Sequence, residues 1–408
     1  MTQSLRTPIV QKFGGSSLSS LEKVRAVARK VLRSADSGRP VVVVVSAMGN
    51  TTSELIERAR SLTDSPPRRE LDVLLSSGER MSTALLAMAI EEEGGSAISL
   101  TGPQSGILTD DQFTNANILD VRPDRVMREL AAGQVVIVAG FQGENRRGDI
   151  TTLGRGGSDT TAVALAGALG AECCEIYSDV DGVYSADPRV VEEPLHLKEV
   201  DSRLMTEYAL HGARVLHPGC IQLAHEKGVA IHASSTFGDD THTRIRRSAD
   251  LSFSLASSDG VSVVGVTSRK HRLRIHGDAS RDLVRCVLDE VGGEEAVLSA
   301  APDELHDLLV DIEDLPDPER VTANLRESLG SYARITEKLA SVSIVTEAAH
   351  AAEVERGFQA ALEDASVAPI GRYRRAHSLT CTASPAERER TIRALHAHLV
   401  EKPVLIGA

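Results

Sequence analysis

The run VVVVV at residues 41–45 constrains the fold of this chain more than any other feature of its sequence. β-Branched residues favour strands, and an uninterrupted apolar run is typical of a strand that is covered on both faces. Strands and helices alternate around it, with strands expected at 8–13, 41–49, 96–102, 134–140 and 171–178, and helices at 18–35, 53–62, 71–93 and after 157. This alternation predicts an α/β fold, a mostly parallel sheet sandwiched by helices.

Polar loops that contain glycine follow three of these strands: KFGGSS at 12–17, SAMGNTT at 46–52 and GFQGEN at 140–145. In a sheet of this kind, ligands bind beyond the carboxyl ends of the strands. One such loop is common, but three at one edge are hard to explain by structure alone. We therefore expect the functional site at this edge.

The stretch TTLGRGGSDTTAVALAGALG at 151–170 places three glycines around an arginine, directly before an apolar helix. Glycine permits positive φ angles and close approach of a ligand. Ser158 or Asp159 is expected to cap the helix, and Gly170 to end it. Backbone N–H groups at a helix N-terminus suit an anion, and the alternative is a glycine-rich loop with an ordinary cap.

Composition excludes several classes of function. The chain has 408 residues, with 45 Lys and Arg against 58 Asp and Glu, and only 3% of its residues are aromatic. An acidic chain with few aromatic residues is not expected to bind nucleic acid. The five cysteines show no metal-binding spacing, and Cys173 and Cys174 are expected to be buried thiols. With neither a secretory leader nor a membrane span in the sequence, we expect a cytoplasmic protein that does not contact a membrane.

The character of the sequence changes near residue 245. A catalytic domain is expected at 1–245, a serine-rich and charged linker at 246–262, and two small α+β modules at 263–408. Within the modules we expect strands at 272–277, 339–347 and 378–384, and helices at 281–292, 351–365 and 385–402. Modules of this size often serve regulation or dimerisation.

Six motifs that occur in a fixed order carry a resemblance to a known family. They are KFGGSS, SAMGNTT, SSGER (76–80), GFQG, TTLGRGGSDTTA and YSDVDGVYSADPR (177–189), and HGARVLHP (211–218) extends them. Together they closely resemble aspartate kinases, of the amino-acid kinase superfamily, to about residue 240. The resemblance implies phosphorylation of the β-carboxylate of L-aspartate by ATP with Mg²⁺, in the biosynthesis of amino acids such as lysine and threonine. It also implies C-terminal ACT-like modules that bind feedback amino acids and form a homodimer or a higher homo-oligomer.

The chemistry of that reaction fits the residues near the first loop. An aspartate side chain has a pKa of ~3.9, so it is already an anionic nucleophile at neutral pH and needs no general base. The enzyme must neutralise charge and position the reactants. Lys12 is placed to contact the transferring phosphoryl group, and Gly14 and Gly15 open the backbone to phosphate oxygens; the alternative for Lys12 is a solvated lysine at a strand end. The order GxxxxGK[ST] is absent, which disfavours a P-loop fold.

Recognition of aspartate requires a cation for its α-carboxylate and an anion for its α-ammonium. Arg155 suits the first because a guanidinium grips a carboxylate through two hydrogen bonds. Glu79 suits the second, although a glutamate in a helical turn is usually just solvated. The resemblance implies the same two roles, adds substrate hydrogen bonds from Thr52 and Ser158, and implies that Asp159 organises the catalytic lysine.

The resemblance also implies a set of residues that bind ATP. Many of them lie in the segment 177–189, which is rich in Asp, Gly and Pro, and the alternative for this segment is a loop with several turns. The set comprises Lys12, Phe13, Gly14, Gly15, Ser46, Tyr177, Ser178, Asp179, Tyr184, Asp187, Arg189 and Arg214. Arg214 stands where the family usually has a lysine, which keeps the charge but changes the geometry. The ligands of Mg²⁺ are not assigned, because phosphates and water can hold most of the ion.

The sequence departs from the family pattern in several places. Gly219 follows Pro218 where the family has an arginine, and His232 and Ser234 stand in two further arginine places. HGDASRDLV at 276–284 lacks the Pro-Gly turn of a feedback-binding ACT module. We therefore expect poor inhibition by lysine and threonine. Two alternatives remain open. One is a related kinase that acts on another acidic or modified amino acid in a dedicated pathway. The other is a non-catalytic ACT-type sensor, which the presence of the catalytic motifs disfavours.

Overall fold

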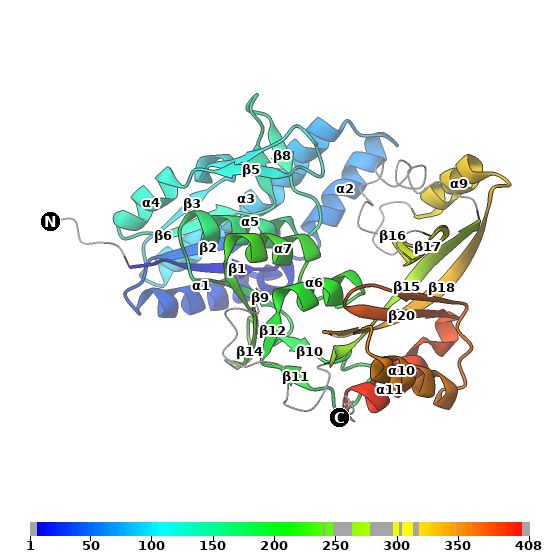
Figure 1. The fold of residues 1–408 in the computed structure, drawn as a ribbon. Coiled ribbons are helices and arrows are strands. Elements are labelled where there is room, and N and C mark those ends of the chain that lie inside the picture. Colours follow the sequence, from blue (N-terminus) through cyan, green and yellow to red (C-terminus); the bar gives the residue numbers. More distant parts are fainter. Residues whose placement is uncertain are drawn as a thin grey trace. The chain divides into compact units, whose positions relative to one another are not determined.

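The computed structural model describes residues 6–239, 241–247, 263–277, 297–301, 304–312, 318–347 and 349–401 (Figure 1). The chain divides into two compact units. The first comprises Met1–Val183, Lys198–Arg203 and Val215–Leu251, and the second comprises Tyr184–Leu197, Leu204–Arg214 and Ser252–Ala408. Segments between residues 184 and 214 thus alternate between the two units.

An eight-stranded sheet forms the centre of the first unit, in the order β12-β14-β13-β9-β1-β2-β6-β3. The strands are β1 Ile9–Phe13, β2 Val41–Val45, β3 Ala97–Leu100, β6 Val135–Ala139, β9 Cys173–Ser178, β12 Glu199–Asp201, β13 Ala230–Ser235 and β14 His242–Arg246. Neighbouring strands are parallel except for the pair β13 and β14. Every residue of β2 is buried, as the run of valines predicts for a central strand. The mostly parallel sheet expected from the sequence is confirmed.

Helices cover both faces of this sheet. They are α1 Leu21–Ala35, α2 Thr51–Leu62, α3 Arg68–Glu92, α4 Asp124–Ala131, α5 Gly157–Ala168 and α7 Pro218–Lys227. On one face α1 and α3 share a hydrophobic core with β2, in which Val27, Leu86 and Val43 are fully buried. On the other face α5 packs on β1, β2 and β9 and against α7. The four helices expected in this part of the chain are therefore present, within a few residues of the expected bounds.

A second, smaller sheet in the first unit was not expected from the sequence. Its order is β5-β4-β7-β8, formed by β4 Ile107–Thr109, β5 Ile118–Val121, β7 Gln142–Glu144 and β8 Ile150–Thr152. Short 3₁₀ turns occur at Gly15–Leu18 (η1) and Pro103–Ser105 (η2). Strands of three or four residues are too short to show a clear alternation of polar and apolar side chains.

One helix corrects the expectation that no segment could span a membrane. Among the described residues, α3 alone is long and apolar enough to do so by length and composition. It carries buried polar side chains, Asp72, Ser76 and Glu79, and packs on α1, β3 and β8. These contacts are those of a core helix of the first unit.

The second unit is built on an antiparallel sheet with the order β16-β17-β15-β18-β20-β19. Its strands are β15 Val263–Gly277, β16 Val297–Ala301, β17 Glu304–Asp311, β18 Ala333–Thr346, β19 Gly371–Arg374 and β20 Ser378–Ala383. Its helices are α9 Pro318–Leu329, α10 Ala352–Asp364 and α11 Arg388–Leu399, the last preceded by a short 3₁₀ turn at Pro385–Glu387 (η5). The helix α6 Ser202–Leu210 and the short strands β10 Val183–Tyr184 and β11 His196–Leu197 lie where the chain passes between the units.

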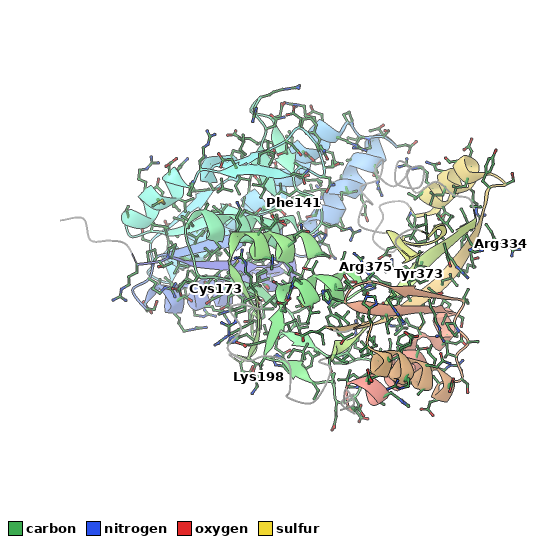
Figure 2. All side chains as sticks on the ribbon, in the orientation of Figure 1. Phe141, Cys173, Lys198, Arg334, Tyr373 and Arg375 are labelled. Carbon is green, nitrogen blue, oxygen red and sulfur yellow. The ribbon has the colours of Figure 1, made fainter. Side chains whose placement is uncertain are left out.

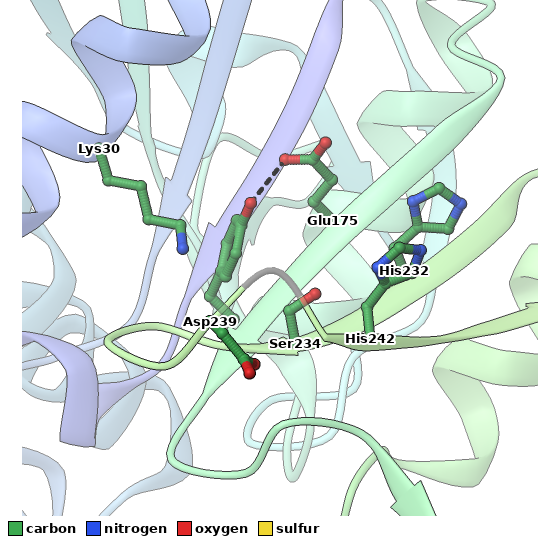
Figure 3. A pocket seen from close by; sticks show the side chains of 7 residues that line it. Lys30, Glu175, His232, Ser234, Asp239 and His242 are labelled. Carbon is green, nitrogen blue, oxygen red and sulfur yellow. Dashed lines mark hydrogen bonds between the residues drawn. The ribbon is translucent and has the colours of Figure 1, made fainter. Parts of the chain in front are cut away.

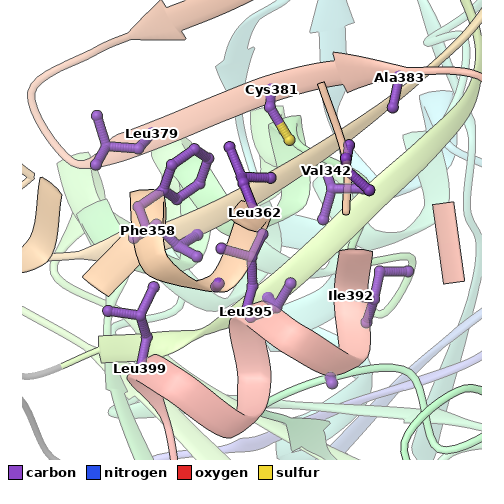
Figure 4. Packing of buried hydrophobic residues seen from close by; sticks show 14 of the residues in the cluster. Val342, Phe358, Leu362, Leu379, Cys381, Ala383, Ile392, Leu395 and Leu399 are labelled. Atoms are coloured by element: carbon purple, nitrogen blue, oxygen red, sulfur yellow. The ribbon is translucent and has the colours of Figure 1, made fainter. Parts of the chain in front are cut away.

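Two hydrophobic cores share the long strands β15 and β18. Leu273 of β15 packs with Val321 and Leu325 of α9 in one core. In the other core Val342 of β18 packs with Phe358 of α10 and with side chains of α11 (Figure 4). The expected α+β character is confirmed, as are the strands at 339–347 and 378–384 and the helices at 351–365 and 385–402. The expected helix at 281–292, the residues 278–284 and most of the linker lie outside the described residues.

Candidate active site

The three loops expected at one sheet edge do meet there. The strands β9, β1, β2 and β6 are neighbours, so their carboxyl ends lie side by side. Gly49 N donates to Gly15 O at 3.0 Å, and Gly14 N donates to Tyr177 O at 3.2 Å. A Cβ atom at Gly15 would lie 2.8 Å from Ala47 O, so the close approach of the first two loops requires glycine at this position.

A buried ion pair lies at the centre of this edge. Lys12 Nζ, near the end of β1, is 2.6 Å from Asp159 Oδ1 in the first turn of α5. The two side chains are only 11% and 13% exposed. Lys12 is therefore not the solvated lysine of the alternative interpretation. A lysine held in this way presents a fixed positive charge at the carboxyl end of β1.

The start of α5 differs from the expected cap. The N-cap residue is Gly156, with φ of 68°, and within the described residues no side chain caps the helix. Ser158 and Asp159 lie inside the first turn instead, so the expectation that either of them caps the helix is wrong. The left-handed glycine ends the loop without a capping side chain, and this leaves the Asp159 carboxylate to pair with Lys12.

Glycine is required in this loop for two reasons. Gly154 and Gly156 both have positive φ angles, 69° and 68°. A Cβ atom at Gly156 would also lie 2.3 Å from the Cβ atom of His217. Arg155 stands between the two glycines on the exposed part of the loop. The backbone that carries this guanidinium is thus fixed by conformations that other residues rarely adopt.

The third loop is tied to the loop of Arg155. Phe141, labelled in Figure 2, has φ of 68°, which is unusual for a bulky residue. Its N–H donates to Thr161 Oγ1 at 3.1 Å, and its carbonyl oxygen accepts from Leu153 N at 2.9 Å. These bonds connect the end of β6 to both sides of the Gly154–Gly157 segment.

Glu79 is buried, not solvated. It lies on α3 and is 3% exposed. Its Oε1 accepts from Ala47 N at 3.0 Å, whereas Oε2 is buried with no hydrogen-bond partner within the described residues. Burial raises the pKa of this carboxyl to about 7. A buried acid with an unsatisfied oxygen is suited to accept a hydrogen bond from a cation.

The residues expected near ATP fall in both units and are described separately. In the first unit Phe13 stacks on Tyr177, with ring centroids 4.9 Å apart, and Ser178 Oγ accepts from Val180 N. In the second unit Arg189 pairs with Asp187 at 2.9 Å and holds the pKa of that carboxyl below its usual value. The other expected residues are Gly14, Gly15 and Ser46 at the sheet edge, exposed Asp179, Tyr184, which packs edge-to-face on His196, and exposed Arg214.

A pocket of about 180 Å³ lies on the face of the sheet away from the ion pair. Side chains alternate along a strand, and β9 aligns Ile176 with Lys12, so Glu175 and Tyr177 point to the opposite face. Figure 3 shows these side chains with the others of the lining: Lys30, Glu175, Tyr177, His232, Ser234, Asp239 and His242. His232 and Ser234, the two departures from the family pattern, thus line this pocket. It includes Tyr177 but none of the residues expected to bind aspartate.

No metal site or reactive thiol accompanies these groups in the described part of the chain. Within it, no three His, Cys, Asp or Glu side chains are arranged to hold a metal ion. Cys174 is fully buried, and burial raises the pKa of its thiol well above the usual value. The expectation of a buried thiol is confirmed for Cys174, while Cys173 is only partly buried.

Two polar residues for which the sequence indicated no role, Asp72 and Gln142, are fully buried beside the site. Gln142 Nε2 donates to Ser76 O at 2.9 Å. A signal was available for Asp72, because it precedes Glu79 by seven residues. Two helical turns separate such residues, so both carboxylates lie on one face of α3.

A mostly parallel α/β sheet whose adjacent strand ends carry glycine loops around a buried lysine–carboxylate pair belongs to the class of α/β proteins that bind ligands beyond the carboxyl ends of their strands. Residues 7–233 match the model of the amino acid kinase family. The chain belongs to this family, and the resemblance to aspartate kinases is confirmed by its relatives.

The chain is 49% identical over 243 residues to the aspartokinase of Mycolicibacterium smegmatis, and 50% identical over 243 residues to that of Corynebacterium glutamicum. Each match covers 59% of this chain and 58% of the relative, so the matched region spans little more than half of each relative's length.

Two solved structures extend the likeness over most of the chain. The aspartate kinase from Synechocystis is 32% identical, with a TM-score of 0.55, and the match covers 95% of this chain and 69% of that one. The E. coli aspartokinase III in complex with aspartate and ADP has a TM-score of 0.78 at 23% identity, and the match covers 96% of this chain and 99% of that one. At that identity the likeness concerns the fold.

Proposed function

We propose that this chain is an aspartate kinase, which transfers the terminal phosphoryl group of ATP to the β-carboxylate of L-aspartate. The ion pair of Lys12 and Asp159, at the edge where three glycine-bearing loops meet, carries the proposal. The aspartokinases among its relatives and the structure with aspartate and ADP support the choice of substrates.

In the reaction, a β-carboxylate oxygen of aspartate attacks the terminal phosphorus, and the bond from that phosphorus to the bridging oxygen of ADP breaks. The products are 4-phospho-L-aspartate and ADP. The principal obstacle is repulsion between two anions, which a fixed positive charge relieves. Lys12 supplies that charge, and Asp159 holds its ammonium group in place.

Aspartate is positioned by groups around the ion pair. Arg155 binds the α-carboxylate, and Glu79 binds the α-ammonium through Oε2, its unsatisfied oxygen. The ammonium favours the ionised form of Glu79, whose pKa is raised to about 7 in its absence. Thr52 and Ser158 form hydrogen bonds with the substrate.

The phosphates of ATP are bound at the same edge. Gly14 and Gly15, which lack side chains, leave room for phosphate oxygens to approach the backbone closely. The nucleoside is assigned to the remaining residues of the expected set: Phe13, Ser46, Tyr177, Ser178, Asp179, Tyr184, Asp187, Arg189 and Arg214. Mg²⁺ would be held largely by phosphate oxygens and water, and it would neutralise negative charge on the phosphates.

The proposed organisation has a catalytic domain at 1–245, a linker at 246–262 and two ACT-like modules at 263–408. The antiparallel α+β architecture of the second unit supports the modules. We further propose that they form a homodimer or a higher homo-oligomer, and that the enzyme works in the cytoplasm in amino-acid biosynthesis.

The test is an ATP-dependent hydroxamate assay, in which hydroxylamine traps the acyl phosphate. Aspartate, glutamate and other acidic amino acids are compared as acceptors. We expect the highest kcat/KM with aspartate. A higher kcat/KM with another acid would indicate a related kinase that acts on that acid. If no acid gave a product, the chain would be a non-catalytic sensor.

A further inference from the structure

One face of α3 forms hydrogen bonds to three segments of the candidate site. Glu79 Oε1 accepts from Ala47 N in the loop after β2, and Ser76 O accepts from Gln142 Nε2 in the segment after β6. Two turns before Glu79, Asp72 contacts the segment that leads to Arg155. The first two contacts are single hydrogen bonds, whereas Asp72 forms three.

The Asp72 carboxylate is fully buried and accepts from two separate segments. Its Oδ2 accepts from Thr114 N at 3.0 Å and from Thr152 N at 2.9 Å, and its Oδ1 accepts from Thr152 Oγ1 at 2.7 Å. Both backbone donors converge on one oxygen. An apolar side chain here would leave two N–H groups without an acceptor in the protein interior.

One of these segments leads into the loop of Arg155, and the other packs against it. Thr152 ends β8, two residues before Gly154. Thr114 has φ of 71°, an unfavourable angle for a β-branched residue. The next residue, Asn115, packs so closely on the loop that a Cβ atom at Gly154 would lie 2.5 Å from its Oδ1. Asp72 therefore holds both the strand that leads into the turn of Arg155 and the segment that packs against this turn.

We propose that Asp72 is a positioning residue for recognition of the substrate α-carboxylate, acting through Thr114 and Thr152 on the loop of Arg155. It does not touch substrate. The inference rests on the proposed function, because the loop is assigned to aspartate there. A purely structural role would lower stability without a selective effect on one substrate.

The experiment compares three variants of the full chain. Asp72→Ala removes all three acceptor contacts. Asp72→Asn retains a carbonyl oxygen that can accept from both backbone N–H groups, so it serves as the conservative rescue. Leu86→Ala, at a fully buried position of the same helix, creates a cavity in the core shared with α1 and β2, removes none of the Asp72 hydrogen bonds, and controls for general destabilisation.

Two readouts are measured, the KM for each substrate and hydrogen exchange at the amides of Thr114 and Thr152. For Asp72→Ala we expect the aspartate KM to rise about tenfold, with the ATP KM changed by less than about twofold. Exchange at both amides should accelerate by about tenfold or more relative to Leu86→Ala. Asp72→Asn should restore most of both properties.

The outcomes separate this inference from the proposed function. Unchanged exchange in Asp72→Ala would overturn the inference, as would equal KM changes for the two substrates or the same pattern in Leu86→Ala. If the wild-type protein phosphorylates no aspartate, the proposed function fails. The inference for aspartate then fails with it, and the exchange data still report whether Asp72 holds the two segments.

Discussion

Lys12 Nζ lies 2.6 Å from Asp159 Oδ1, which links β1 to the first turn of α5 in a nearly dry environment. The two groups should therefore act as a unit in catalysis. Replacing Asp159 by Asn removes the anion that holds the lysine, and we expect kcat to fall by about 10²-fold. A double-mutant cycle with Lys12→Met checks this, because Asp159→Asn should cost far less when the lysine is already absent. Independent, multiplicative effects would contradict the coupling.

Arg155 is assigned to the substrate carboxylate. Arg155→Lys keeps the positive charge but loses the two parallel N–H donors, so the aspartate KM should rise by about tenfold or more while the ATP KM changes little. Arg147→Lys is a matched control, since Arg147 is an exposed arginine in the same unit that pairs with Asp111. If the KM values for both substrates rose together in Arg155→Lys, the residue would belong to the nucleotide site or to folding.

Burial of Glu79 predicts a pH dependence of stability. The pKa of this carboxyl rises from an ordinary 4.5 to about 7 on folding, so the folded protein binds the proton more tightly than the unfolded chain. Protonation of Glu79 therefore stabilises the folded protein, fully below pH 4.5, and this stabilisation is lost as the pH rises through 7. Relative to wild type, Glu79→Gln should therefore gain up to about 3 kcal/mol of unfolding free energy between those limits.

Denaturant unfolding of both proteins between pH 4 and 8 measures this difference. A difference that does not change with pH would show that folding leaves the pKa of Glu79 at its ordinary value, and would contradict this prediction. Saturating aspartate should reduce the effect, because the substrate ammonium stabilises the ionised carboxylate.

Regulation gives a fourth prediction, from the sequence alone. The stretch at 276–284 has Asp, Ala and Ser where a feedback-binding module has Pro-Gly. A side chain fills the space and an added carboxylate repels the effector's own. Lysine and threonine at millimolar concentrations, singly and together, should therefore inhibit the kinase assay poorly. Strong, cooperative inhibition would show that other residues build an effector pocket.

Much of the first unit could be predicted from the sequence because its signals are local. A valine run such as 41–45 identifies a central strand by itself, and loops that directly follow parallel strands must meet at one edge. The loop of Lys12 was located in this way, and the loop of Arg155 was located by its three glycines before an apolar helix. The resemblance to a family then supplied roles that spacing alone could not.

The parts of the fold and of the site that could not be predicted depend on contacts between residues that are distant in sequence. Asp72 and Thr152 are 80 residues apart, so nothing near either residue indicates their hydrogen bonds. The cap of α5 was misassigned because Ser158 and Asp159 are common capping residues, whereas the pairing of Asp159 with Lys12 is a tertiary interaction. The strand expected at 272–277 is longer than predicted, because β15 continues through the charged stretch SRKHR at 268–272, whose composition does not indicate a strand.

The rate of ATP-dependent aspartyl hydroxamate formation by Lys12→Ala, compared with wild type and Lys198→Ala, tests the account most directly. Lys198 is a matched control because it is an exposed lysine of the first unit that is not among the expected substrate or nucleotide residues. We predict a loss of about 10²- to 10³-fold in kcat for Lys12→Ala in a protein that remains folded, and a rate near wild type for Lys198→Ala. Turnover by Lys12→Ala close to that of wild type would contradict the assignment of the reacting centre.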